Sequence, residues 1–370
     1  MRTRTLLFFS LLLAACQDGC EQKQPARAAD PTPLREAPTP VVAAAPPVPR
    51  RKEVAAWVVP YEDSLRSLSR HLPVLTVSSP TFYRLDVAGE RVRLVDWDWR
   101  VPFPRARLAR APGVRVLPLV GCIGECGPKI SRVLEDPNAR RAHVKDLLRA
   151  VEEDGVDGLF IDYENVDAKP ESVTAFFTEL RAGLAPRKKT LAAAVEEPCG
   201  WAAGCKREHY AFALKEVAAQ VDLLAVMEYD LAVDGTRPPA PREWIERGLA
   251  QVVREVGPEV AATKVLLGIP YYGRITQGAI GDTAVLFAEV TADSVRGHRF
   301  GPFVPKADRA AVSKVAALPS DGKPLTLFLE DHTTLQERIG IGEAAKLAGV
   351  AIWRLGSEDP CNVSVLATYQ

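Results

Sequence analysis

Eight short apolar runs, most of them separated by amphipathic segments, constrain the fold of this chain more than any other feature. The runs lie at residues 54–61, 74–83, 114–121, 158–165, 189–195, 221–230, 264–273 and 349–356. Segments with helical periodicity lie at residues 62–72, 139–154, 172–184, 242–256 and 334–348. Apolar strands that alternate with helices are typical of α/β proteins with a buried, parallel sheet.

Eight such strands in one chain predict an α/β fold of the (β/α)8 TIM barrel type. An open, doubly wound sheet is the alternative, although no Gly-rich phosphate loop follows the first apolar run. The segment between Tyr272 and Leu325 is long for one connection, so we expect a small insertion after strand 7.

The charge balance excludes one class of partner. Lys plus Arg and Asp plus Glu are both 47, and the body of the chain has no Lys/Arg-rich block. A protein that binds a polyanion usually carries a basic surface. We therefore expect no nucleic-acid partner.

The first residues are typical of an export signal. Arg2 and Arg4 precede an apolar run that is too short to span a bilayer, and small residues precede Cys16. The ending Leu13-Ala14-Ala15-Cys16 resembles the lipobox of bacterial lipoproteins, which implies a signal peptide at 1–15 and lipidation of Cys16. An ordinary cleaved signal peptide is the alternative.

Residues 16–52 are rich in Pro and Ala and lack aromatic residues, which predicts a disordered tether. The folded domain would then be residues 53–370, lipid-anchored in the bacterial cell envelope on the periplasmic or outer-surface side. In that oxidising setting the pairs Cys122/Cys126 and Cys199/Cys205 are disulfide candidates, with free thiols or a metal site as alternatives.

The apolar run at 158–165 ends in two carboxylates, Asp162 and Glu164. Alternate residues of a barrel strand point inward, so Phe160, Asp162 and Glu164 share the inner face and Tyr163 faces the helices. The carboxylates then lie at the carboxyl end of the strand, where the active sites of such barrels lie.

Two neighbouring carboxylates repel each other, which raises the pKa of one of them and suits a general acid. A metal site or a pair with Arg is the alternative. Asp230 and Glu196 could add metal ligands, but no His ends a strand. We expect no metal and no cofactor.

Four motifs occur in an order that resembles one known family. DGLFIDYE at 157–164 resembles the DxxDxDxE signature of glycoside hydrolase family 18, the chitinase family. MEYD at 227–230, GIPYYGR at 268–274 and GVAIWRLG at 349–356 resemble its motifs on strands six, seven and eight. The chain is most similar to the chitobiase-like and spore-cortex-lytic branch.

The resemblance implies a retaining, substrate-assisted mechanism for β-1,4 bonds of N-acetylglucosamine-containing glycans, such as peptidoglycan or chitin oligosaccharides. It implies that Glu164 is the general acid and base, that Asp162 holds the acetamido N–H, and that Tyr229 aims the acetamido oxygen. Asp230 would help to shape this subsite, and Trp353 would form the floor beneath the sugar.

Further substrate-binding residues follow from the same motifs and from the mouth loops. Met227 and Tyr272 belong to the strand-six and strand-seven motifs, and Trp201 lies in the loop between Cys199 and Cys205. Trp57 on the first strand is a weaker aromatic candidate. Any of these aromatic residues, Tyr229 and Trp353 included, could instead be part of the core.

Two departures from the family pattern stand out. The SxGG pattern of strand three is absent, and Phe160 occupies a position where the family usually carries Asp or Asn. Phe160 cannot share a proton with Asp162 and would fill the barrel interior instead. A catalytically inactive, lectin-like barrel is the alternative function, although such relatives usually lose the terminal Glu. We expect a monomer.

Overall fold

The computed structural model describes residues 51–89, 91–96, 103–198, 211–231, 238–276, 282–285, 287, 306–318, 325–356 and 358–370. From Glu53 onward these residues belong to one compact unit, Glu53–Gln370. The predicted signal peptide, Cys16 and nearly all of the tether lie outside the described residues, as do Cys199, Trp201 and Cys205. No helix in the described part of the chain is long and apolar enough to cross a membrane.

The main sheet has eleven strands in the order β4-β3-β6-β7-β8-β9-β10-β16-β1-β2-β5. All neighbours in it pair parallel except β3 and β4. Its strands are β1 (Glu53–Val58), β2 (Val77–Pro80), β3 (Tyr83–Ala88), β4 (Arg91–Asp96), β5 (Arg115–Val116), β6 (Leu119–Cys122), β7 (Gly158–Tyr163), β8 (Thr190–Glu196), β9 (Leu223–Met227), β10 (Val265–Pro270) and β16 (Gly349–Trp353).

The segment from Arg115 to Cys122 closes this sheet into a barrel. Its first part, β5, pairs with β2, and its second part, β6, pairs with β7. The amide of Leu117 donates to Ser78 at 3.0 Å, and the carbonyl of Pro118 accepts from Phe160 at 2.9 Å. One segment thus joins both ends of the series of parallel strands, which confirms the predicted barrel.

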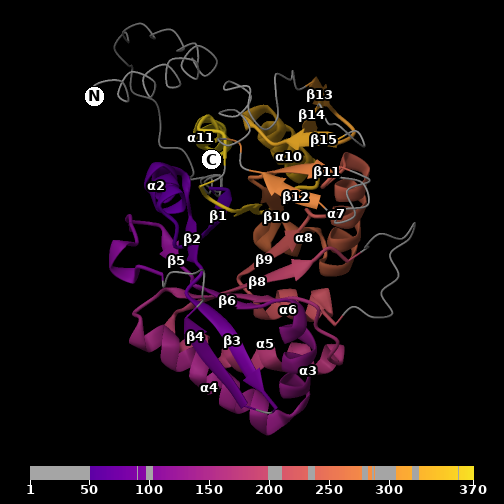
Figure 1. Ribbon diagram of the computed structural model, residues 1–370. Helices are drawn as coiled ribbons and strands as arrows, with labels where there is room; N and C mark the ends of the chain where they lie inside the picture. Colours follow the sequence, from indigo (N-terminus) through magenta and orange to yellow (C-terminus); the bar gives the residue numbers. More distant parts are fainter. Residues whose placement is uncertain are drawn as a thin grey trace, which may run out of the picture. The chain divides into compact units, whose positions relative to one another are not determined.

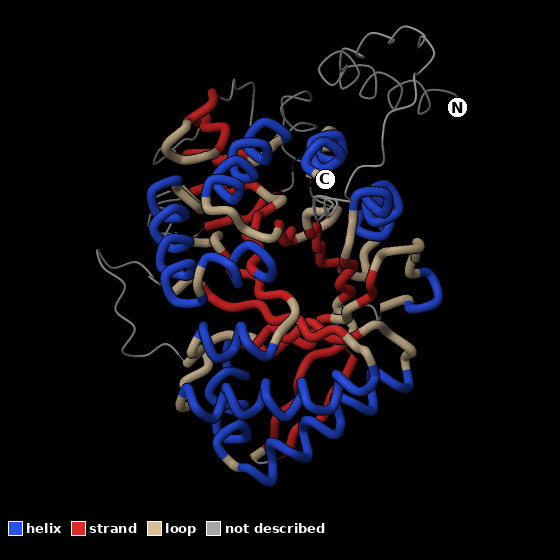
Figure 2. Tube along the Cα trace, turned by 180° about the vertical axis from the view of Figure 1, so that it is seen from behind, coloured by secondary structure: helices blue, strands red, loops and turns tan. Residues whose placement is uncertain are grey.

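Helices surround the strands on the outside of the barrel (Figure 1, Figure 2). Most connect consecutive barrel strands, as the alternation of the sequence predicts. They are α2 (Glu62–His71), α3 (Gly127–Glu135), α4 (Pro137–Glu153), α5 (Pro170–Leu184), α6 (Leu214–Gln220), α7 (Arg242–Val256), α8 (Pro258–Lys264), α10 (His332–Ala344) and α11 (Asn362–Tyr369).

The two faces of β7 pack into different cores, as its parity predicts. Tyr163 faces the helices, where its ring stacks on Phe176 of α5 at 5.5 Å and its hydroxyl lies 2.7 Å from His143 Nε2 of α4. Phe160 faces the barrel interior and packs on Trp57 of β1 at 5.0 Å between ring centroids. The remaining interior is formed largely by small side chains, among them Ala55, Ala192, Ala194, Ala225 and Ala351. These alanines leave the room that the two large rings fill.

The region after β2 differs from the sequence-based prediction. The run 74–83 was expected to be one strand, but β2 ends at Pro80 and an antiparallel hairpin, β3–β4, begins at Tyr83. The turn of this hairpin contains Gly89 at φ +61°. The alternating pattern on both sides of Gly89 is typical of a hairpin and differs from the continuous apolar runs of the barrel strands. The run 114–121 likewise divides into β5 and β6 around Pro118, whose nitrogen cannot donate to a neighbouring strand.

The predicted insertion after strand 7 is a second, antiparallel sheet in the order β12-β11-β15-β14-β13. Its strands are β11 (Gly273–Thr276), β12 (Asp282–Val285), β13 (Lys306–Asp308), β14 (Ser313–Leu318) and β15 (Leu325–Leu329). Arg338 of α10 attaches the insertion to the barrel, because its buried guanidinium donates to Glu330 at 3.1 Å and to the carbonyl of Val312 at 3.1 Å.

Cys122 and Cys126 form a disulfide, which confirms one of the two predicted pairs. It joins the end of β6 to the short helical turn at Gly124–Cys126, directly before α3. Cys361 is a buried thiol.

Gly158, the first residue of β7, provides a test of the barrel's packing. It has φ +153°, and a Cβ there would lie 1.8 Å from the Thr190 carbonyl oxygen of β8. Gly158→Ala is therefore expected to lower the free energy of unfolding in urea by about 3 kcal/mol. Gly155→Ala is the matched control, because Gly155 has φ +58° but open space around it, and the expected cost is about 1 kcal/mol. Equal losses would contradict this account of the strand contact.

Candidate active site

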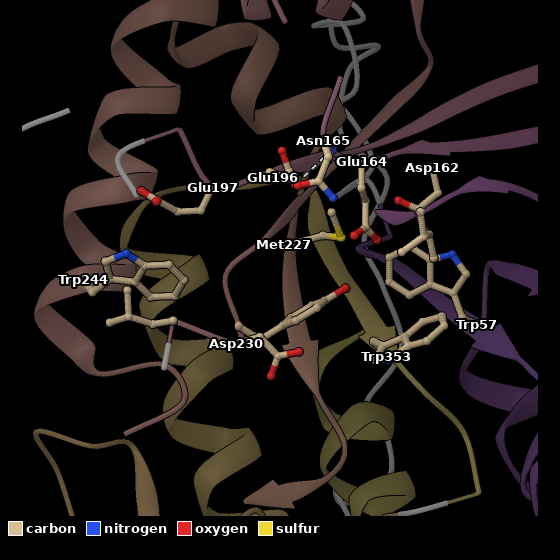
Figure 3. Close-up of a pocket in the computed structure, with 13 residues that line it drawn as sticks. Trp57, Asp162, Glu164, Asn165, Glu196, Glu197, Met227, Asp230, Trp244 and Trp353 are labelled. Atoms are coloured by element: carbon tan, nitrogen blue, oxygen red, sulfur yellow. Dashed lines mark hydrogen bonds between the residues drawn. The ribbon is translucent and has the colours of Figure 1, made fainter. Parts of the chain in front are cut away.

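A cavity of about 530 Å³ opens at the carboxyl ends of the barrel strands (Figure 3). Its walls combine carboxylates with aromatic rings and contain no Lys, Arg or His among the described residues. The lining residues are Trp57, Ile123, Asp162, Glu164, Asn165, Glu196, Glu197, Met227, Tyr229, Asp230, Leu231, Trp244 and Trp353.

Asp162 and Glu164 project into this cavity from the end of β7. Asp162 is only 4% exposed, and its Oδ1 has no hydrogen-bond partner among the described residues. The amide of Glu164 donates to the Cys122 carbonyl at 2.9 Å, which extends the pairing with β6. The chain turns at Asn165, with φ 55°, a left-handed conformation that Asn tolerates. This turn leaves the Glu164 side chain at the rim of the buried strand.

Burial makes both carboxyl groups hold their protons more tightly. It raises the pKa of Asp162 to about 7, with a further contribution from the charge of Glu196. It raises the pKa of Glu164 to about 8, assisted by the charges of Asp162, Glu196 and Asp230. Glu164 thus carries a proton near neutral pH, which is the state that a general acid requires.

Tyr229 and Asp230 follow β9 and face the same cavity. Burial raises the pKa of the Tyr229 phenol well above its usual value, so this group is a hydrogen-bond donor throughout the neutral range. Asp230 has φ 61° and forms an ion pair with Arg274 of β11, whose Nε lies 3.1 Å from Asp230 Oδ1. The insertion therefore contributes the counter-ion that holds Asp230.

The aromatic side of the cavity is formed by Trp353 at the end of β16 and by Trp57 of β1. Their rings meet edge to face at 5.8 Å, and Phe160 supports Trp57 from below. Met227, the last residue of β9, packs against this interior cluster. Trp353 is partly exposed, so its ring is part of the cavity surface as well as of the core. Indole rings of this kind suit the apolar faces of sugars.

The structure thus gathers six of the predicted site residues around one cavity: Asp162, Glu164, Met227, Tyr229, Asp230 and Trp353. Tyr272 is not among the lining residues; it is 7% exposed, and its ring lies 5.1 Å from the guanidinium of Arg274, which pairs with Asp230. Trp201 lies outside the described residues. Trp57, expected only as a weak candidate, is a wall residue.

Several lining residues were missed or misread from the sequence. Glu196 was considered only as a possible metal ligand, and Glu197, Asn165 and Trp244 were not considered. Residues 191–195 are apolar throughout, so they give no alternation from which the inward parity of Glu196 could be read. Trp244 gives no signal either, because it lies on α7, a helix.

One group of side chains away from the cavity has the composition of a metal site. His332, Asp359 and Cys361 place potential ligand atoms within 4.8 Å of one another. Asp359, however, already accepts from the amides of His332 at 3.1 Å and Cys361 at 3.0 Å, and it lies 2.7 Å from His332 Nδ1. Hydrogen bonds that join the starts of α10 and α11 account for this arrangement.

The fold is similar to several solved structures. A chitinase from Chromobacterium violaceum superposes with a TM-score of 0.71 at 19% identity, covering 86% of this chain and 98% of the other. The spore cortex-lytic enzyme SleL from Bacillus cereus gives 0.69 at 18% identity, with 86% and 74% covered. A family 18 N-acetylglucosaminidase from Paenibacillus barengoltzii gives 0.64 at 19% identity, with 86% and 100% covered.

Sequence comparison gives the assignment. A Bacillus subtilis (strain 168) protein described as the uncharacterized glycosylase YvbX is 23% identical over 238 residues, which are 63% of this chain and 67% of that relative. Residues 86–359 match the family model described as glycosyl hydrolases family 18. With most of its barrel and all four sequence motifs inside that match, the chain belongs to glycosyl hydrolase family 18.

Proposed function

We propose that this glycosidase hydrolyses β-1,4 bonds next to N-acetylglucosamine by a retaining, substrate-assisted mechanism. The observation that carries the proposal is a half-buried Glu164, with its pKa raised to about 8, facing the same cavity as Asp162, Tyr229 and Trp353. The cavity therefore combines a proton donor, a buried acceptor, a phenol donor and an aromatic platform.

Each group matches one part of an N-acetylated sugar. The ring would lie on Trp353 with its 2-acetamido group directed toward Asp162 and Tyr229. The unpartnered Asp162 Oδ1 is available to accept from the acetamido N–H, and the Tyr229 phenol donates to the acetamido oxygen. These two contacts hold the acetamido oxygen against the anomeric carbon, where it acts as the nucleophile.

The reaction then has two steps. In the first, the acetamido oxygen bonds to the anomeric carbon, the glycosidic C–O bond breaks, and the proton of Glu164 moves to the leaving oxygen. In the second, the Glu164 carboxylate takes a proton from water while the water oxygen bonds to the anomeric carbon and the ring of the intermediate opens. Glu164 regains its proton, and the anomeric configuration is retained.

The proposed substrate and location rest on the predicted lipid anchor and tether at the N-terminus. If Cys16 is lipidated and residues 16–52 are a tether, the barrel is held close to a bacterial membrane. An envelope-anchored enzyme of this kind would meet peptidoglycan first, and chitin oligosaccharides present the same acetamido group. We therefore propose cell-wall glycan as the substrate, with chitin oligosaccharides as the alternative.

Product analysis separates these substrates. The full-length protein is incubated with purified peptidoglycan and with chitin oligosaccharides, and the products are identified by mass. We expect fragments with a 2-acetamido sugar at the new reducing end, because Asp162 and Tyr229 would contact the acetamido group of the sugar on that side of the bond. N-acetylmuramic acid at the new reducing end would mean that this sugar, rather than N-acetylglucosamine, occupies the subsite formed by Asp162 and Tyr229. No release from either substrate would contradict the proposed function.

Glu164→Gln separates an enzyme from a lectin-like barrel. Removing the proton donor is expected to lower kcat by about 100-fold or more while leaving ligand affinity nearly unchanged. Turnover is measured with chitin oligosaccharides and binding by calorimetry. Glu171→Gln, an exposed carboxyl in the first turn of α5, is the control. Glycan binding without hydrolysis by the unmodified protein would favour the lectin.

The pH dependence tests the role of Glu164 as an acid. Because burial and three neighbouring carboxylates raise its pKa to about 8, the proton needed in the first step is present at neutral pH. It is lost as the pH rises through that value. We expect kcat/KM to fall about tenfold per pH unit above about 8. An alkaline limb near pH 5, the ordinary range of a Glu, would contradict this assignment.

A further inference from the structure

Glu196, the last residue of β8, stands level with Glu164 on the inner face of the barrel. Asp162 pairs in register with Ala194, so two residues further along each strand Glu164 and Glu196 become neighbours. Ala192 and Ala194 belong to the interior cluster, which fixes the inward parity of Glu196. Adjacent strands lie about 4.8 Å apart. Both carboxyl groups line the same cavity (Figure 3).

Glu196 also contacts the backbone that carries Glu164. The amide of Asn165 donates to Glu196 Oε1 at 3.3 Å. Asn165 is the left-handed residue at which the chain turns away from the barrel, and it directly follows Glu164. The contact thus ties the turn that aims Glu164 to the neighbouring strand.

The charges that face Glu164 come from three elements. Asp162 lies on β7 itself, Glu196 on β8, and Asp230 after β9. Asp230 also forms an ion pair with Arg274, and it contributes least of the three to the raised pKa of Glu164. Tyr229 faces the same cavity as a protonated phenol. Burial raises the pKa of Glu196, and the bond from the Asn165 amide opposes this by favouring the charged form.

The inner side of Asp162 offers no comparable charge. Phe160 lies there, fully buried against Trp57. Glu196 is the one charged neighbour that contributes to the raised pKa of Asp162 among the described residues. The charge that helps to raise the pKa of Asp162 therefore comes from β8 and not from β7, the strand that carries Asp162.

We propose that Glu196 is a positioning residue for the reaction: its carboxylate anchors the turn that aims Glu164, and its negative charge opposes ionisation of Glu164. This inference rests on the proposed function, since it assigns Glu164 as the acid. Glu196 acts through Glu164 and Asp162 and forms no bond to the sugar.

Glu196→Gln is the central test. It keeps the size of the side chain and an oxygen for the Asn165 amide but removes the charge. We expect the alkaline limb of kcat/KM to move down by about one pH unit. Turnover at pH 8 then falls about fivefold, because about half of Glu164 is protonated before the change and about a tenth after it. Glu196→Asp keeps the charge but reaches less far, so it should lower kcat while the limb moves much less.

Glu197→Gln is the matched control. Glu197 follows Glu196 and lines the same cavity, and its substitution by Gln removes the same charge. It is not, however, among the groups that raise the pKa of Glu164. The alkaline limb of kcat/KM in Glu197→Gln should therefore stay in place, whatever the effect of the substitution on KM. Equal shifts in Glu196→Gln and Glu197→Gln would overturn the proposal, because they would reflect the summed charge of the cavity.

A second measurement needs no turnover. The carboxyl carbon of Glu164 is followed by NMR in the protein labelled with ¹³C at Glu side chains, with Glu164→Gln used to assign the signal. The Glu164 titration should move to lower pH in Glu196→Gln and not in Glu197→Gln. An unmoved titration overturns the proposal even if the protein hydrolyses glycans. A shifted titration without hydrolysis would support the electrostatic contact between Glu196 and Glu164 but contradict the proposed function, so the two failures are distinguishable. If Glu196→Gln does not fold, Glu196→Asp decides: a loss of kcat with an almost unmoved limb supports the proposal, and unchanged kcat overturns it.

Discussion

Closure of the sheet by the segment Arg115–Cys122 is the constraint on which the remaining structure depends. By pairing with β2 through one half and with β7 through the other, this segment leaves no open edge in the ring of parallel strands. The interior of such a ring is reached by water only at its ends. Side chains on the inner face of β7 are therefore desolvated by the topology itself.

Desolvation gives the carboxylates their chemistry. A carboxyl group at the end of an open, solvated strand would be ionised at neutral pH and could donate no proton. Inside the closed ring, Asp162 and Glu164 retain protons at much higher pH, because burial penalises their charged forms. The interior that supports them is apolar: Trp57 and Phe160 fill the space left by the alanines of β1, β8, β9 and β16. Closure of the barrel thus accounts both for the apolar packing of its interior and for the raised pKa values of Asp162 and Glu164.

The remaining groups of the site are placed by the elements that end at the same rim. Tyr229 and Asp230 follow β9, Trp353 ends β16, and Glu196 ends β8. Asp230 is held from outside the barrel, by Arg274 of the inserted sheet. The insertion therefore contributes to the active site through a counter-ion, and its attachment through Arg338 and Glu330 has a functional consequence.

The sequence by itself determined the barrel, the inward parity of β7 and six residues of the cavity, because strand periodicity and four local motifs are properties of short segments. It also identified the Cys122–Cys126 pair, whose partners are close in sequence. The β3–β4 hairpin was not predicted, because its alternating apolar and polar residues differ from the continuous apolar runs of the barrel strands.

Only the tertiary structure decided which residues from different segments meet. Glu196 stands beside Glu164 because of the register between β7 and β8, and Trp244 reaches the cavity from a helix. Arg274 pairs with Asp230 across forty-four positions of the chain. Tyr272, expected at the substrate, instead lies beside Arg274. The physical reason is that pairing register, enclosure and charge proximity are relations between segments, and a pattern within one segment does not contain them.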